Sequence, residues 1–144
     1  MSEALAIRNL KFRYAPAGPW VVDIPALSLG AGEQMLLSGG SGKGKSTLLQ
    51  LIAGLLDANE GEVVVNGQAM GSFSGAQRDL FRGRSIGMIF QTFNLLHGFS
   101  AVENVMVAMM FSTIPAKEHR QRALGLLTHP GITERRRDTP TMYV

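Results

Sequence analysis

Residues 39–47 read Gly39-Gly40-Ser41-Gly42-Lys43-Gly44-Lys45-Ser46-Thr47, and this stretch decides the fold because it fits the pattern G-x-x-x-x-G-K-[ST]. Glycines let such a loop wrap closely around a phosphate, so that several backbone N–H groups converge on it. We expect Lys45 to reach the β- and γ-phosphate oxygens and the Ser46 hydroxyl to bind Mg²⁺. All residues of the loop, Lys43 and Thr47 included, are therefore predicted to bind a nucleoside triphosphate.

The sequence on either side of the loop supports this interpretation. An apolar run at 34–38 leads into Gly39 and predicts a central parallel strand. After Ser46, leucine and isoleucine recur at helical spacing, which predicts an amphipathic helix whose positive N-terminal end faces the phosphates. An ordinary glycine turn between a strand and a helix has no need of Lys45-Ser46 at this offset. The expected fold class is therefore α/β, of the P-loop type.

Size and composition narrow the choice further. The chain has 144 residues, 45% of them hydrophobic and 17% charged, which suits one globular domain. It has no cysteine, and no apolar run approaches the length of a membrane span. The net charge is +3, but the only arginine cluster is Arg135-Arg136-Arg137, which we interpret as a solvated face or tail. We therefore expect no nucleic-acid partner.

Hydrophobic spacing and turn residues predict the remaining elements. The expected strands are 4–14, two short strands at 20–24 and 27–29, a hairpin strand at 62–65 with an Asn66-Gly67 turn, and a second core strand at 85–90. The expected helices are 74–82, 100–111 with a capping box at Ser100, and 116–128 after Pro115.

Single side chains outside the loop allow more than one interpretation. Met106, Met109 and Met110 have helical spacing and are expected in the core, although methionines also suit a pliable surface for a membrane partner. His97 and His119 are expected to be exposed rather than to bind metal.

Several motifs together resemble the ATP-binding cassette of ABC transporters. They are Tyr14, the loop at 39–47, Gly61-Glu62-Val63 with Asn66-Gly67, and Ile86-Gly87-Met88-Ile89-Phe90-Gln91. Two further segments are similar in sequence to those of the branch that serves lipoprotein-releasing, macrolide-exporting and cell-division systems. They are Phe93-Asn94-Leu95-Leu96 and Ser100-Ala101-Val102-Glu103-Asn104-Val105. The resemblance extends from about residue 4 to 140. It implies a fold with an N-terminal antiparallel β portion, a P-loop core and the start of a helical subdomain.

The resemblance also implies roles for individual residues. Tyr14 is expected to stack on adenine, although it is also a plausible residue of a half-buried sheet. Gln91 is expected to touch Mg²⁺ and the attacking water, so the implied catalytic residues are Lys45 and Gln91 and the implied metal ligands are Ser46 and Gln91. The implied cofactors are ATP and Mg²⁺. Lys43 stands where the family usually has a small residue.

The sequence departs from the family pattern after residues 131–140. In the family this linker leads to the LSGGQ-type signature, the Walker B strand and a switch histidine, whereas here the sequence ends at Val144 without them. We therefore expect an incomplete cassette, the N-terminal two-thirds of a transporter's ATP-binding subunit, that binds ATP without efficient hydrolysis. The resemblance implies an ABC-type ATPase, and this 144-residue chain is expected to be inactive alone. A nonhydrolytic nucleotide-binding or interaction module is the alternative.

Partners and organisation follow from the same resemblance. We expect one partial nucleotide-binding domain, with the β portion and P-loop core at 1–91 and the helical part at 92–144. The expected partners are a transmembrane permease and a second ATP-binding subunit, on the cytoplasmic face of a membrane. If strands from outside this sequence flank 34–38, its apolar edges are exposed, and the chain is expected to be marginally stable, oligomeric or prone to aggregate.

Overall fold

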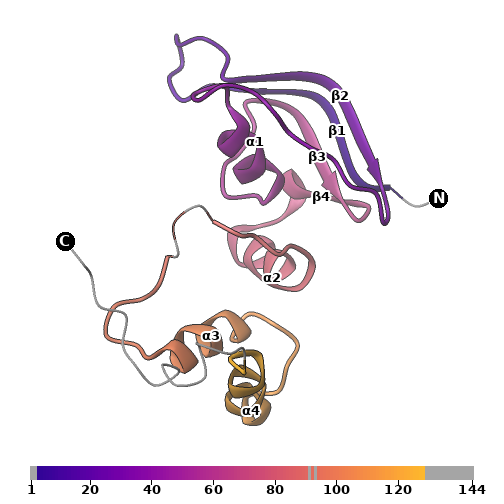
Figure 1. The fold of residues 1–144 in the computed structure, drawn as a ribbon. Helices are drawn as coiled ribbons and strands as arrows, with labels where there is room; N and C mark the ends of the chain where they lie inside the picture. The colour runs from indigo at the N-terminus through magenta and orange to yellow at the C-terminus, as the bar shows by residue number, and fades with distance from the viewer. Residues whose placement is uncertain (1–2, 91, 93, 129–144) are drawn as a thin grey trace. The chain divides into compact units, whose positions relative to one another are not determined.

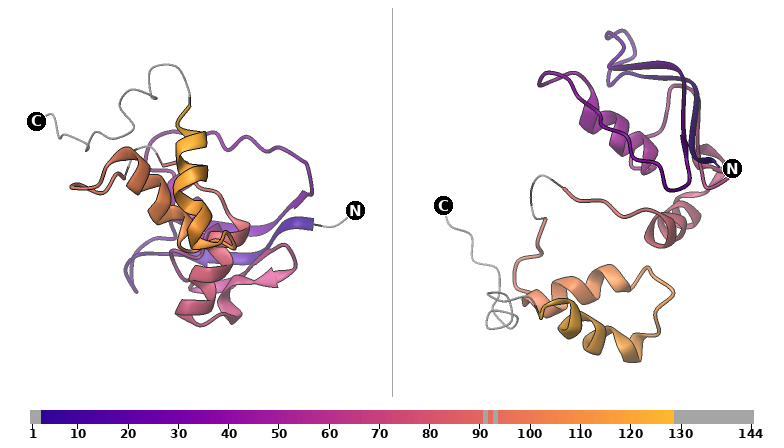
Figure 2. Two further views of the ribbon diagram at one scale, coloured as in Figure 1. Left: turned by 90° about the horizontal axis from the view of Figure 1, so that it is seen from below. Right: turned by 45° about the vertical axis from the view of Figure 1, so that its right-hand side comes forward.

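A computed structural model describes residues 3–90, 92 and 94–128. It divides into two compact units, Met1–Arg78 and Asp79–Val144 (Figures 1 and 2). The elements, in chain order, are β1 (Glu3–Phe12), β2 (Val22–Gly30), α1 (Lys45–Ile52), β3 (Glu60–Val65), β4 (Gln68–Ala69), the short 3₁₀ helix η1 (Met70–Ser72), α2 (Gly75–Ser85), α3 (Ala101–Met109) and α4 (Ala116–Leu126).

The first unit is built on a four-stranded antiparallel sheet in the order β2-β1-β3-β4. The two short strands predicted at 20–24 and 27–29 are wrong, because β2 runs without a break through Pro25. The pairs Arg8↔Ala26 and Leu10↔Ile24 flank this proline. Since β2 lies at the edge of the sheet, it tolerates a residue that has no N–H to donate.

The predicted hairpin is confirmed. β3 and β4 are joined by Asn66 and Gly67, whose φ angles are 48° and 77°. Positive φ at both central residues is what a type I′ turn requires, and asparagine and glycine adopt it at little cost. The sequence therefore fixes this turn locally.

The core of the first unit lies between the sheet and α1 (Figure 1). Leu48 and Leu51 of α1 are buried, and so are Ile7 and Leu10 of β1 and Val63 of β3. Full burial of such side chains stabilises a fold by roughly 1.5–3 kcal/mol each. This packing fixes the helix that follows the glycine-rich loop.

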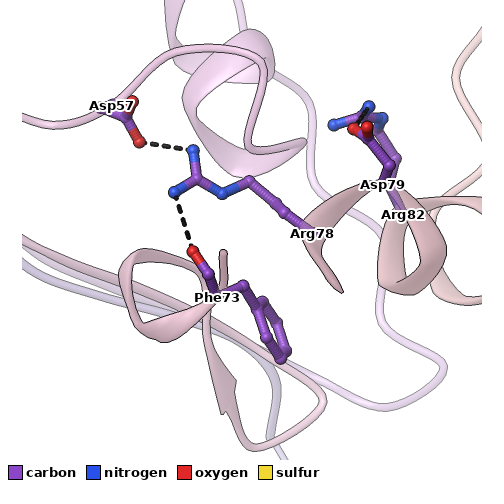
Figure 3. Close-up of polar contacts among 5 residues, drawn as sticks. All are labelled: Asp57, Phe73, Arg78, Asp79 and Arg82. Atoms are coloured by element: carbon purple, nitrogen blue, oxygen red, sulfur yellow. Dashed lines mark hydrogen bonds and ion pairs between the residues drawn. The ribbon is translucent and has the colours of Figure 1, made fainter. Parts of the chain in front are cut away.

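Arg78, at the first turns of α2, holds two connections of the first unit together (Figure 3). Its guanidinium donates to Asp57 Oδ1 at 2.5 Å and to the Phe73 carbonyl at 3.4 Å. Asp57 lies after α1 and Phe73 lies before α2. The partly buried Arg78 side chain therefore links the segment before the β3–β4 hairpin to the segment after η1. Farther along α2, Arg82 pairs with Asp79 one turn away.

Two predicted core strands are not strands in the structure. Residues 34–38 and 86–90 have no ladder partner among the described residues, and Ser85 instead ends α2. Several apolar side chains of both runs are exposed, with Leu36 at 90% and Ile89 fully accessible. An apolar run becomes a strand only when another strand satisfies its backbone N–H and C=O groups.

In the second unit, α3 packs against α4, and both predicted helices are confirmed to within two residues at their ends. The Ser100 capping box is present, since Ser100 Oγ accepts from the Glu103 N–H while the Glu103 carboxylate accepts from the Ser100 N–H. Val102, Met109 and Ala123 form the centre of the small core.

The structure corrects the predicted burial of His119 and of one methionine in this unit. His119 is buried rather than exposed, and one of its ring nitrogens lies 2.8 Å from the Ile114 carbonyl oxygen where α4 packs against α3. The three methionines differ in burial. Met109 is buried, Met106 is partly buried against the core, and Met110 is 68% exposed. The predictions for Gln91, Phe93, the 131–140 linker and Arg135–Arg137 lie outside the described residues.

Candidate functional site

The glycine-rich loop closes over the side chain of Lys45. The Lys45 ammonium donates to the carbonyl oxygens of Gly39 and Gly40 at 2.6 and 2.7 Å. The loop turns through Gly42 and Gly44, whose φ angles are 74° and 79°, in the left-handed region that glycine adopts without strain. The ammonium is therefore held against the loop, on carbonyls that are also exposed to solvent.

The loop leads directly into the N-terminus of α1. Gly44 is the N-cap and Lys45 is the first helical residue, and the first turn carries no acidic residue. No side chain caps this helix end within the described part of the chain. The free N–H groups of a first turn, together with the positive end of the helix dipole, favour an anion.

Gly44 also anchors the loop against the start of β2. A Cβ atom at this position would lie 2.5 Å from the Val21 carbonyl oxygen, so only glycine permits this approach. The Val21 N–H in turn donates to the Phe12 carbonyl at 2.8 Å. The end of the loop is thereby fixed to the sheet.

Tyr14 lies beside the same helix. Its hydroxyl is 2.9 Å from Thr47 Oγ1, and its ring meets Phe12 edge to face with the centroids 4.9 Å apart. Thr47 is buried, whereas Tyr14 is 65% exposed and presents much of its surface to solvent. A tyrosine held by its hydroxyl next to the loop suits the predicted role in binding a base, which stays a prediction.

A cavity of about 230 Å³ adjoins the loop. It is lined by Val21, Val22, Asp23, Ile24, Leu37, Ser38, Lys43, Gly44, Lys45 and Leu48. A larger cavity of about 400 Å³ lies in the same unit around Leu51, Met70 and Arg78, away from the loop. The smaller cavity is the candidate site because its lining contains two lysines and the N-terminus of α1, which suit an anion.

The residues predicted for the site are only partly brought together by the structure. Ser46 is exposed in the first turn of α1, where its hydroxyl is accessible to a metal ion. The described residues contain no group of three or more His, Cys, Asp or Glu side chains suited to a metal. A cation here would thus depend on the Ser46 hydroxyl together with oxygens of its ligand.

Sequence reasoning missed the supports of the site. Phe12 packs on Tyr14, and the Arg13 backbone N–H donates to Asn59 Oδ1 at 2.7 Å while its guanidinium lies 4.4 Å from the Trp20 ring centroid. The i, i+2 spacing of Phe12 and Tyr14 was a usable signal, because such residues share one face of a strand. The approach of Gly44 to Val21 had no signal in the sequence.

Comparison with known proteins decides the family. A family model described as "ABC transporter" matches residues 22–143, most of the chain. The chain belongs to the ABC transporter family. The ABC-type P-loop fold class is thereby confirmed, and the loop at 39–47 lies within the matched region.

Curated relatives of this ABC family member carry the name lipoprotein-releasing system ATP-binding protein LolD. The protein of Pseudomonas syringae pv. tomato is 36% identical over 139 residues, which cover 95% of this chain and 61% of the relative. That of Psychrobacter arcticus is 41% identical over 110 residues, or 76% of this chain and 49% of the relative. The resemblance to the lipoprotein-releasing branch is thus confirmed, and the chain spans about half to three-fifths of these relatives' length.

Solved structures of ABC proteins have the same fold as this chain over most of its length. A dimeric ATP-binding cassette in a post-hydrolysis state, bound to ADP and Pi, is 25% identical with a TM-score of 0.79, over 95% of this chain and 63% of the other. CbiO1 of Clostridium perfringens, part of an ABC transporter complex, is 25% identical with a TM-score of 0.74, over 96% and 55%. Among the described residues of this ABC family member, no helix is long and apolar enough to cross a membrane.

Proposed function

We propose that the chain binds Mg-ATP through residues 39–47 as part of the ATP-binding subunit of an ABC transporter. The observation that carries this proposal is the placement of the Lys45 ammonium at the uncapped N-terminus of α1. A cation, free first-turn N–H groups and a glycine turn without bulky side chains are the features that a polyphosphate needs. No acidic side chain in that turn opposes an anion.

Four residues, two of them in the loop, are assigned separate parts in this binding. Lys45 already bonds two carbonyl oxygens, so its ammonium can exchange one or both for phosphate oxygens at small cost. Ser46 is assigned to the metal ion, and Tyr14 to the base, with its hydroxyl anchored on Thr47. Bound Mg²⁺ supplies positive charge to the phosphate oxygens. Gln91 is assigned to the γ-phosphate region on the resemblance alone.

We propose further that the 144-residue chain binds without efficient hydrolysis. The sequence has no LSGGQ-type stretch and no apolar strand that ends in Asp-Glu, and such groups ordinarily contribute orders of magnitude to the rate. The names of the relatives, which are ATP-binding proteins of a lipoprotein-releasing system and part of an ABC transporter complex, support a transport role. On the resemblance alone, the proposed partners are a transmembrane permease and a second ATP-binding subunit, at the cytoplasmic face of a membrane. The alternative is a nonhydrolytic interaction module, which would show no turnover even with a permease.

The experiment compares wild type, Lys45→Ala and Lys117→Ala. Lys117 is an exposed lysine of α4 and serves as the matched control for loss of one positive charge. Binding of a fluorescent ATP analogue and release of phosphate are measured in parallel. We expect wild type and Lys117→Ala to bind alike, Lys45→Ala to lose binding, and all three to release phosphate at background rate. Equal binding by Lys45→Ala would refute the site, and robust turnover by wild type would refute the nonhydrolytic proposal.

A further inference from the structure

Two lysines, rather than one, belong to the candidate site. Lys43 and Lys45 both line the cavity of about 230 Å³ beside the loop. Asp23 is the only acidic residue in that lining. The site therefore carries two positive side chains and one negative side chain, in addition to the positive end of α1.

The stem of Lys43 runs along the peptides that hold Lys45. Its Cβ and Cγ atoms lie 3.9 Å from the positions that Cβ atoms would occupy on Gly39 and Gly40. The carbonyls of these same two glycines accept the hydrogen bonds of the Lys45 ammonium. The two lysine side chains thus share one short segment of backbone, and a lysine stem is long enough to bring its ammonium to an anion bound there.

Lys43 is not neutralised by a neighbour. Its side chain is exposed, and none of the ion pairs formed among the described residues includes it. Asp23 is an exposed residue of the edge strand β2, and no ion pair joins it to Lys43. An anion bound at this backbone segment would therefore meet a second positive side chain whose charge no described ion pair neutralises.

We propose that Lys43 is a second phosphate-binding cation, which makes this loop favour nucleoside triphosphates over diphosphates. This inference rests on the proposed nucleotide site and assigns part of its specificity. Because the attraction grows with the charge of the ligand, loss of Lys43 weakens the binding of ATP more than that of ADP. Because the contact is exposed to solvent, its contribution falls as salt screens it.

The test uses Lys43→Ser, which removes the charge and leaves a small polar residue, and Lys43→Arg, which keeps the charge. Lys117→Ser is the matched control in α4. The Kd values for Mg-ATP and Mg-ADP are measured by calorimetry at low and high salt. We expect Lys43→Ser to weaken ATP binding about threefold to fivefold at low salt, as an exposed charge pair allows. The ATP/ADP preference of Lys43→Ser should fall, and high salt should reduce its difference from wild type. Lys43→Arg should retain the preference for ATP and its salt dependence, and Lys117→Ser should match wild type.

The outcomes separate this inference from the proposed function. If Lys45→Ala abolishes binding while Lys43→Ser binds both nucleotides like wild type, the role of Lys43 is refuted and the nucleotide site stands. Equal weakening of ATP and ADP, independent of salt, would show a disturbed loop and also refute it. If wild type binds neither nucleotide, both proposals fail. Circular dichroism of each variant verifies that the fold is retained.

Discussion

Replacement of Gly44 by alanine should destabilise the first unit more than the same replacement of Gly42. Both glycines have positive φ, 79° and 74°, so alanine is strained at either position. They differ in their surroundings. A Cβ on Gly44 would lie 2.5 Å from the Val21 carbonyl oxygen, whereas a Cβ on Gly42 meets nothing within 4 Å. Gly42→Ala is therefore a matched control that contains the backbone strain without the collision.

The magnitude follows from these two contributions. Left-handed backbone costs a non-glycine residue about 1–2 kcal/mol, and the lower entropy of the unfolded alanine chain offsets about 0.4–1 kcal/mol. Gly42→Ala should therefore lower the free energy of unfolding by about 0–1.6 kcal/mol. At Gly44 the Val21 carbonyl must also move away, and overpacking of this kind adds typically 1–3 kcal/mol. Since the Val21 N–H is bonded to Phe12, that movement disturbs the start of β2 as well.

The assay is urea unfolding of wild type and both variants, followed by the fluorescence of Trp20, the single tryptophan of the chain. Trp20 precedes β2, so its signal reports on the region that the collision disturbs. We expect Gly44→Ala to lose at least about 1 kcal/mol more than Gly42→Ala. Equal losses in the two variants would refute the argument that the approach of Gly44 to Val21 fixes the loop.

Two further outcomes follow from the described residues. Hydrogen bonds from the backbone N–H and then the hydroxyl of Ser100 lower the pKa of Glu103 below its ordinary value of 4.5, so α3 should be stabilised above this pH and lose that stability as the pH falls through the lowered pKa. Glu103→Gln should remove this acid-dependent loss in urea unfolding between pH 7 and 3, and an unchanged pH profile would contradict the cause. The exposure of Leu36 and Ile89 predicts association that rises with concentration, and Leu36→Glu or Ile89→Glu should reduce it in sedimentation velocity. A monodisperse wild-type monomer at all concentrations would count against this.

The elements that the sequence predicted correctly are those whose signals are local. The Asn66-Gly67 turn and the Ser100 capping box depend on the conformation of a few adjacent residues. A strand at 34–38 or at 86–90 would need another strand to pair with. The apolar pattern predicted both strands, but no such pairing partner occurs among the described residues. Pro25 led to the opposite error, since the sequence predicted a break in a strand that is continuous. The cost of a proline to a strand depends on whether the strand lies at an edge of the sheet, as β2 does.

The same division holds for the candidate site. The loop pattern predicted the glycine turn and the placement of Lys45 before α1, because these features belong to one continuous stretch. The bond between Tyr14 and Thr47 joins residues 33 positions apart, and the approach of Gly44 to Val21 depends on where β2 begins. Such contacts arise from tertiary packing, which a single sequence does not record.

The structure also shows that the loop is anchored at one end. Its C-terminal end is fixed by the Gly44–Val21 approach and by the burial of Leu48 and Leu51. Its N-terminal end continues directly into residues 34–38, which have no ladder partner among the described residues. Because the Gly39 and Gly40 carbonyls hold the Lys45 ammonium, any strand that paired with 34–38 would also fix the position of that ammonium. The position of the Lys45 ammonium is therefore coupled to any pairing of residues 34–38, even though Lys45, Gly39 and Gly40 are close together in the sequence.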